Sequence, residues 1–123
     1  MPYNYFCTVI RWIDGDTLEV EIDLGFHITV RGSLRIFGLY CPEIGKAKSF
    51  AERLEGLKAK QKAETLVPVG CKTQLQTIQA TPADKVVYFE KYGRFLGNLA
   101  IPNGGDFADA MIKAGCGQAK AES

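Results

Sequence analysis

Carboxylates and arginines placed beside tight turns are the side chains of this sequence with the clearest chemical potential. Asp16 follows a turn signal and Glu43 follows a proline, while Arg35 lies between them and Arg94 comes after a second turn. A guanidinium matches the geometry of a phosphate, and a carboxylate can orient a water molecule. No serine or histidine nucleophile accompanies this set. The combination predicts metal-assisted hydrolysis of a phosphodiester rather than acyl transfer.

Asp16 has an unusual position in its predicted strand. Leu18, Val20 and Ile22 alternate with acidic residues, as in a half-buried strand, and Asp16 has the parity of the apolar side chains. A carboxylate on that side must lie at the mouth of a barrel, be paired, or bind a metal, because burial of an unpaired charge is costly. Hard cations such as Ca²⁺ take oxygen ligands of this kind. The alternative is a solvated turn, and Arg35 and Glu43 taken singly could equally be exposed surface residues.

The elements that must position these residues are strands in the first half of the chain. Residues 7–13, 18–22 and 28–36 form three apolar or alternating runs that are separated by turn signals, which predicts an antiparallel meander. The third run places Ile28, Val30, Leu34 and Ile36 on one side.

Helical spacing follows in residues 46–67, where Ala59 and Ala63 share one face. Ser49 and Glu52 have the spacing of a capping box, and Gly56 is expected to divide the segment into a short and a longer helix. Two more strands are predicted over residues 71–80 and 86–101, with a hairpin turn at 91–94, and then a short helix over 107–114. This order predicts a β-rich α+β domain. We expect a five-stranded Greek-key barrel of the oligonucleotide/oligosaccharide-binding type with two or three flanking helices.

Length and composition set limits on the function. The 123 residues fit a single domain over 1–123, and 15 Lys and Arg against 14 Asp and Glu give a net charge of +1. That balance excludes a strongly basic protein that coats nucleic acid through its overall charge. No run of about 18 apolar residues predicts a membrane span, and no signal peptide is recognised, so a cytoplasmic location is expected. The four cysteines lack metal-ligand spacing and are expected to be buried free thiols.

Three segments in this order resemble the staphylococcal nuclease (thermonuclease-like) family. The first is Ile13-Asp14-Gly15-Asp16-Thr17, the second is Leu34-Arg35 with Cys41-Pro42-Glu43, and the third is Lys91-Tyr92-Gly93-Arg94. The closing helix over 109–115 is also similar, and the resemblance covers residues 8–118. It implies the barrel fold and a hydrolase that cuts single-stranded DNA or RNA with Ca²⁺. We expect the protein to act as a monomer without a membrane partner.

The resemblance also implies roles for individual residues. Asp16 matches the family's metal-binding aspartate, and Glu43 matches the glutamate assigned to the attacking water. Arg35 and Arg94 match the two arginines that bind the phosphate and stabilise its charge in the transition state. Thr17 matches a residue beside the metal ligands.

Three further residues match functional residues of the family. The backbone carbonyl of Cys41 matches another calcium ligand. Lys91 and Tyr92 match residues near a terminal phosphate of a bound nucleotide.

Tyr40 departs from the family pattern, because a second metal-binding aspartate usually stands at its position. The departure predicts that calcium is bound weakly, since affinity rises with the number of charged ligands. It leaves open a second interpretation, in which the domain is a catalytically weakened or inactive barrel that binds nucleic acid or protein. A small barrel without a nucleic-acid partner would agree with the charge balance but would leave the arginines unexplained.

Overall fold

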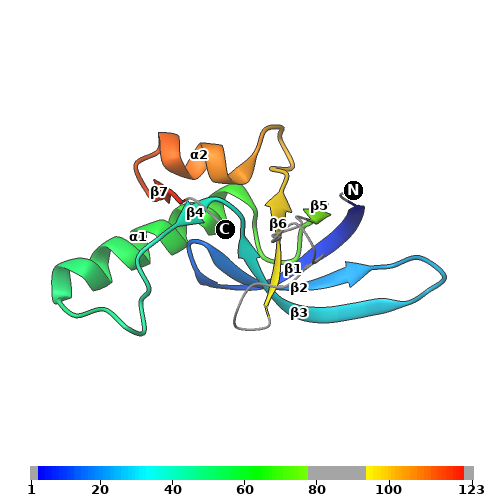
Figure 1. Cartoon of the computed structure of the whole chain (residues 1–123), viewed down its shortest axis with the longest axis horizontal. Helices are drawn as coiled ribbons and strands as arrows, with labels where there is room; N and C mark the ends of the chain where they lie inside the picture. The colour runs from blue at the N-terminus through cyan, green and yellow to red at the C-terminus, as the bar shows by residue number, and fades with distance from the viewer. Residues whose placement is uncertain (1–2, 78–93, 121–123) are drawn as a thin grey trace, which may run out of the picture.

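A closed barrel forms the centre of the structure, a computed structural model that describes residues 3–77 and 94–120 (Figure 1). Its strands, in chain order, are β1 (Asn4–Asp14), β2 (Thr17–Asp23), β3 (Thr29–Ile36), β5 (Lys72–Thr77) and β6 (Phe95–Leu99). The order around the barrel is β1-β2-β3-β6-β5. The predicted antiparallel meander β1-β2-β3 is confirmed, and parallel pairing of β3 with β6 closes the barrel. The predicted strand residues 78–80 and 86–89 and the predicted turn residues 91–93 lie outside the described residues.

Alternating side chains of the strands fill the barrel. Val9, Leu18, Val20, Leu34 and Leu75 are buried in one continuous core. Each strand that alternates in sequence thus sends its apolar set inward, which fixes the register of its neighbours.

An aromatic contact extends this core to the helices. The ring of Trp12 stacks on Phe107 at a centroid distance of 4.9 Å. The indole Nε1 of Trp12 donates to the carbonyl of Val67 at 2.9 Å. Trp12 therefore ties the end of β1 to both helices.

Helix α1 (Phe50–Leu66) packs across one end of the barrel as a single element. The amide of Glu52 donates to the Ser49 side chain at 3.1 Å, which confirms the predicted cap. The predicted break at Gly56 is wrong. A Cβ at Gly56 would lie 3.0 Å from both Ile44 Cγ1 and the Pro42 carbonyl oxygen, so glycine allows the helix to approach residues 42–44 closely.

The remaining elements form a layer beside α1 (Figure 1). Helix α2 (Phe107–Lys113) begins at Asp106, whose carboxylate accepts from the Asp109 amide at 3.0 Å. The short strands β4 (Leu39–Tyr40) and β7 (Gln118–Ala119) pair antiparallel. The fold is therefore the expected β-rich α+β barrel with two flanking helices in the described residues. No helix within these residues is long and apolar enough to cross a membrane.

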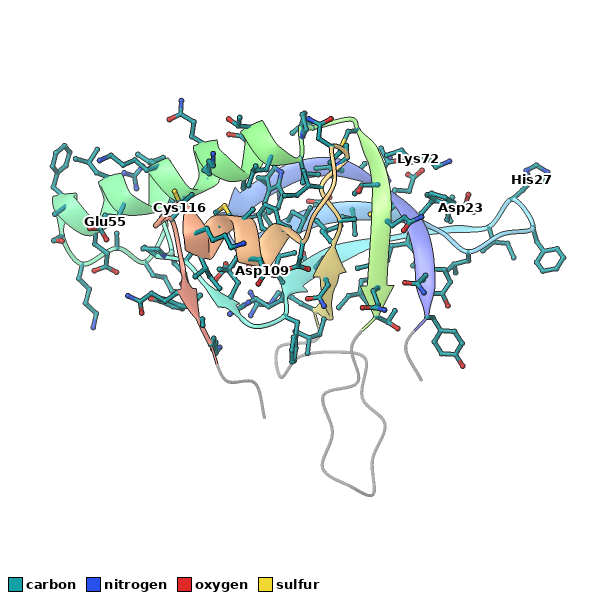
Figure 2. All side chains as sticks on the ribbon, turned by 90° about the horizontal axis from the view of Figure 1, so that it is seen from above. Asp23, His27, Glu55, Lys72, Asp109 and Cys116 are labelled. Carbon is teal, nitrogen blue, oxygen red and sulfur yellow. The ribbon has the colours of Figure 1, made fainter. Side chains whose placement is uncertain are left out.

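The β2–β3 hairpin extends beyond the barrel, with His27 near its tip (Figure 2). Ile28, which we expected on the inward side of the third strand, is exposed, because β3 begins at Thr29 and the tip has no layer to cover it.

All four cysteines are free thiols; Cys7 and Cys41 are buried and the other two are partly buried. Burial raises the pKa of Cys7 to about 11 and that of Cys41 to about 12, so these two thiols are protonated at neutral pH.

Candidate active site

Asp16 and Arg35 form a buried ion pair where β2 begins and β3 ends. The Nη2 of Arg35 lies 3.7 Å from Oδ2 of Asp16, and the two residues are only 6% and 4% exposed. The β2–β3 register pairs Thr17 with Arg35, and the Ile36 amide donates to the Asp16 carbonyl at 2.9 Å. Arg35 also donates to the carbonyl of Ile36. Two residues that are 19 positions apart in the sequence are thus held together by strand pairing.

Both carboxylate oxygens of Asp16 have protein donors. Oδ1 accepts from the Thr17 hydroxyl at 3.0 Å, and Oδ2 accepts from the Cys41 amide at 2.9 Å. The parity of Asp16 predicts a carboxylate that lies at the barrel mouth, is paired or binds a metal, and the structure shows that it is paired. The Cys41 amide draws the segment after β4 against Asp16. The role of the Cys41 carbonyl as a ligand stays a prediction.

Asp14 also belongs to this site, although the sequence pattern around it indicates only a turn. Its Oδ1 accepts from the Ile44 amide at 3.0 Å, which fixes the residue after Glu43 to the end of β1. Burial raises the pKa of Asp14, the Ile44 hydrogen bond opposes that shift, and the negative charges of Asp16 and Glu43 add to it. The three carboxylates are therefore electrostatically coupled. The signal in the sequence was the spacing of two residues between Asp14 and Asp16.

Glu43 lies at the more open edge of the same site. It is half-buried, and its carboxylate is 3.8 Å from the Nζ of Lys46. A hollow of about 470 Å³ adjoins it, with Asp14, Arg53 and Lys60 among the lining residues. A partly solvated carboxylate in such a position can hold a water molecule.

Arg94 lies directly before β6. The β3–β6 register pairs Arg35 with Leu96, and directly paired side chains share a face of the sheet. Arg94 has the parity of Leu96, so strand alternation places it on the side of Arg35. Lys91 and Tyr92 lie outside the described residues.

Tyr40 does not contribute a ligand in the way that an aspartate would. It pairs with Gln118 across the β4–β7 sheet, and its side chain is 44% exposed. Its side chain lines a hollow on the side of α1. The backbone after Tyr40 contacts Asp16, and Tyr40 itself is among the residues that line the hollow beside α1.

The donor set determines which metal the site could take. Within residues 3–77 and 94–120, no three Asp, Glu, His or Cys side chains are grouped closely enough to hold a metal ion. Asp16 is the one buried carboxylate there. Oxygen donors alone suit a hard cation, and its affinity falls when charged ligands are few. A calcium site in the described residues would thus have Asp16 as its buried charged ligand, and calcium binding here stays a prediction.

A model of the family described as staphylococcal nuclease homologue matches residues 33–123 of this chain. The matched region begins in β3 and includes Arg35, Glu43 and Arg94, whereas Asp14 and Asp16 precede it. A comparison with the curated proteins finds no match.

Proposed function

This chain belongs to the staphylococcal nuclease family, and we propose that it hydrolyses phosphodiester bonds of single-stranded DNA or RNA. The observation that carries the proposal is the buried Asp16–Arg35 pair with Asp14 and Glu43 beside it. A buried ion pair is a poor source of stability, because desolvation of both charges offsets their attraction. Such a pair at the end of a small barrel is better explained by its chemistry than by the fold.

Each side chain has a role that follows from its place. Arg35 and Arg94 bind the scissile phosphate and stabilise the charge that develops on it, which is the largest electrostatic contribution expected here. Glu43 orients the attacking water and accepts its proton. Asp16 and the Cys41 carbonyl would hold calcium, with Thr17 beside them.

The metal and the bound strand complete the proposed site. Calcium, when bound, would polarise a phosphoryl oxygen and neutralise its charge. As the family resemblance implies, Lys91 and Tyr92 would bind a terminal phosphate of the bound strand.

Cleavage of a labelled single-stranded oligonucleotide tests this proposal. We expect cleavage in calcium and none in a chelator, and Glu43→Gln should lower the rate by about 10²-fold or more, as for loss of a general base. Glu64→Gln, a change of the same kind at an exposed position of α1, is the matched control and should keep the wild-type rate. Equal rates for Glu43→Gln and wild type would remove the role of Glu43, and absence of calcium-dependent cleavage would contradict the proposal.

Tyr40→Asp tests the proposed cause of weak calcium binding. The new carboxylate would stand next to the Cys41 amide that contacts Asp16, and one added charged ligand should tighten calcium binding about tenfold, or roughly 1.4 kcal/mol. Calorimetric titration measures this, with the neutral Tyr40→Asn as control. Equal affinities of the two variants would show that the site differs from the family's in more than one ligand.

Tyr40 also favours a second candidate function. A barrel that lacks the second carboxylate could retain the phosphate-binding arginines and bind nucleic acid without cutting it. Oligonucleotide binding in calcium without product formation would establish this second function.

A further inference from the structure

A hollow of about 490 Å³ lies between α1, β4 and the segment that follows α2. Among its lining residues are Tyr40, Glu55, Lys58, Ala114, Cys116 and Gln118. Glu55 and Cys116 appear at one end of the molecule, far from the hairpin tip at His27 (Figure 2). Pockets that take small ligands have volumes of about 300–1,000 Å³, so a single nucleotide unit is within the range of this one.

Three side chains give the hollow a definite chemical character. Tyr40 is 44% exposed and is one of the residues that line the hollow. Gln118 is paired with Tyr40 across the β4–β7 sheet, so an amide with donors and acceptors stands beside the ring. Lys58 adds a cation from α1. An aromatic face, an amide and a cation are the groups that recognise the face, the edge and the phosphate of a nucleotide.

The wall opposite α1 is backbone that is firmly held. A Cβ at Gly117 would lie 2.7 Å from Leu39 Cδ1 and 3.0 Å from Cys41 Sγ, so the chain at Gly117 is packed against β4. At Gly115 the corresponding position is open. The absence of a side chain at Gly115 leaves room in this wall for a flat ring.

The hollow is joined to the candidate active site through the backbone. Cys41 follows Tyr40 directly, and its amide donates to Asp16 at 2.9 Å. Tyr40 is thus one residue along the chain from a backbone group that contacts Asp16, which is itself paired with Arg35.

We propose that this hollow is a nucleobase subsite, in which one base of a bound single strand stacks on Tyr40 and meets Gln118 with its edge. The inference rests on the proposed function for the position of the strand, but it requires binding and not cleavage. Tyr40 is then a specificity-determining residue: the position that lacks a metal ligand contributes to recognition of the base.

Binding in a chelator tests the subsite independently of hydrolysis. The probes are a fluorescent thymidine tetranucleotide and an abasic phosphodiester of the same length. Stacking on one aromatic ring corresponds to about a tenfold preference for the base-containing probe. We expect Tyr40→Phe to keep this preference and Tyr40→Ala to lose it, with the affinity for the abasic probe unchanged in both. A preference that survives in Tyr40→Ala, or a wild type without any preference, would overturn the subsite.

A second variant fills the hollow without changing Tyr40. Ala114 lines the hollow and has ordinary helical backbone angles (φ −77°, ψ −5°), so Ala114→Phe should fold. It should abolish the preference for the base-containing probe, while Lys113→Ala, on the neighbouring exposed position, should keep it. Retention of the preference in Ala114→Phe would place the base elsewhere.

Cys116 provides a readout on the unmodified protein. Its thiol is partly buried and lines the hollow, whereas Cys71 is partly buried at a distance from it. Thymidine monophosphate should slow alkylation of Cys116, measured by mass spectrometry, several-fold more than deoxyribose 5-phosphate does. The rate at Cys71 should not change. Equal protection by both compounds would show that the base does not enter the hollow.

If cleavage fails in the earlier test but these base effects are found, the nuclease proposal is wrong and the subsite stands.

Discussion

Asp16 serves both the fold and the candidate chemistry. Its carboxylate accepts from Thr17 and Cys41 and pairs with Arg35, so it fixes the start of β2, the end of β3 and the segment after β4 at one point. The alternation of β2 was enough to predict that this carboxylate lies at the barrel mouth, is paired or binds a metal, and the structure shows it buried and paired. Its partners could not be predicted, because Arg35 and Cys41 reach it only through strand pairing that the local pattern does not specify. The same holds for Tyr40, whose direction depends on pairing with β7.

The raised pKa of Asp14 leads to a prediction about stability and pH. The pKa of Asp14 is higher in the folded than in the unfolded protein, so the protonated carboxyl favours folding more than the ionised one does. This contribution to the free energy of unfolding is complete below the unfolded pKa and is lost as the pH rises through the folded pKa. Asp14→Asn removes that loss, and its amide oxygen can still accept from Ile44. In a chelator, the variant should be more stable than wild type at about pH 7, and the difference should shrink towards about pH 3.

Urea unfolding at several pH values measures this difference. Glu64→Gln, on the exposed face of α1, is the control and should change stability little at any pH. A wild type that is more stable than Asp14→Asn at neutral pH would mean that the ionised carboxylate is favourable in the fold, contrary to the expected direction.

The elements show which predictions depend on local signals. The cap at Ser49 and the turn between β1 and β2 involve residues within a few positions of each other, and both were predicted. The prediction that Gly56 breaks the helix is wrong. A glycine is needed at this position because the helix packs closely against Pro42 and Ile44, which belong to a different segment. The β7 strand has only two residues and exists through its pairing with β4. Features that depend on distant contacts were therefore missed, although the alternating strands sufficed to predict the barrel.

The turn between β1 and β2 is positioned by its contact with α1. A Cβ at Gly15 would lie 2.8 Å from the Cβ of Ala59 and 3.0 Å from Cys41 Sγ. Gly15→Ala should therefore force the turn away from the helix, with a loss of about 1–3 kcal/mol of stability, as for overpacking in a core. Because the turn carries Asp14 and Asp16, we expect a loss of oligonucleotide cleavage as well.

Gly45→Ala is the matched control, because no atom lies within 4 Å of the added Cβ. Thermal unfolding and the cleavage rate should both stay near the wild-type values in this control. If Gly15→Ala unfolds at the wild-type temperature, the turn can move without cost and α1 does not fix the position of the site.

At the scale of the whole molecule, the small net charge limits how nucleic acid can be bound. With +1 overall, the protein has no strong field to attract a polyanion, so affinity must come from a few local contacts. Two exposed arginines, Arg11 and Arg31, are already paired with Glu19 and Glu21 at 2.8 Å on the outer face of the barrel. These two paired arginines are therefore expected to contribute little to the electrostatic part of binding.

The salt dependence of oligonucleotide binding tests this distribution of charge. Each phosphate neutralised on a single strand contributes about −0.7 to the slope of log K against log salt concentration, so two or three contacts at Arg35, Arg94 and Lys91 predict a slope of about −1.4 to −2.1. Fluorescence anisotropy in a chelator measures the slope. Arg94→Ala should make it shallower by about 0.7, whereas Arg11→Ala should leave it unchanged, because Arg11 is paired with Glu19 away from the site. A slope steeper than about −4 would require six contacts or so, and would mean that the strand follows a much longer basic path over the surface than the candidate site provides.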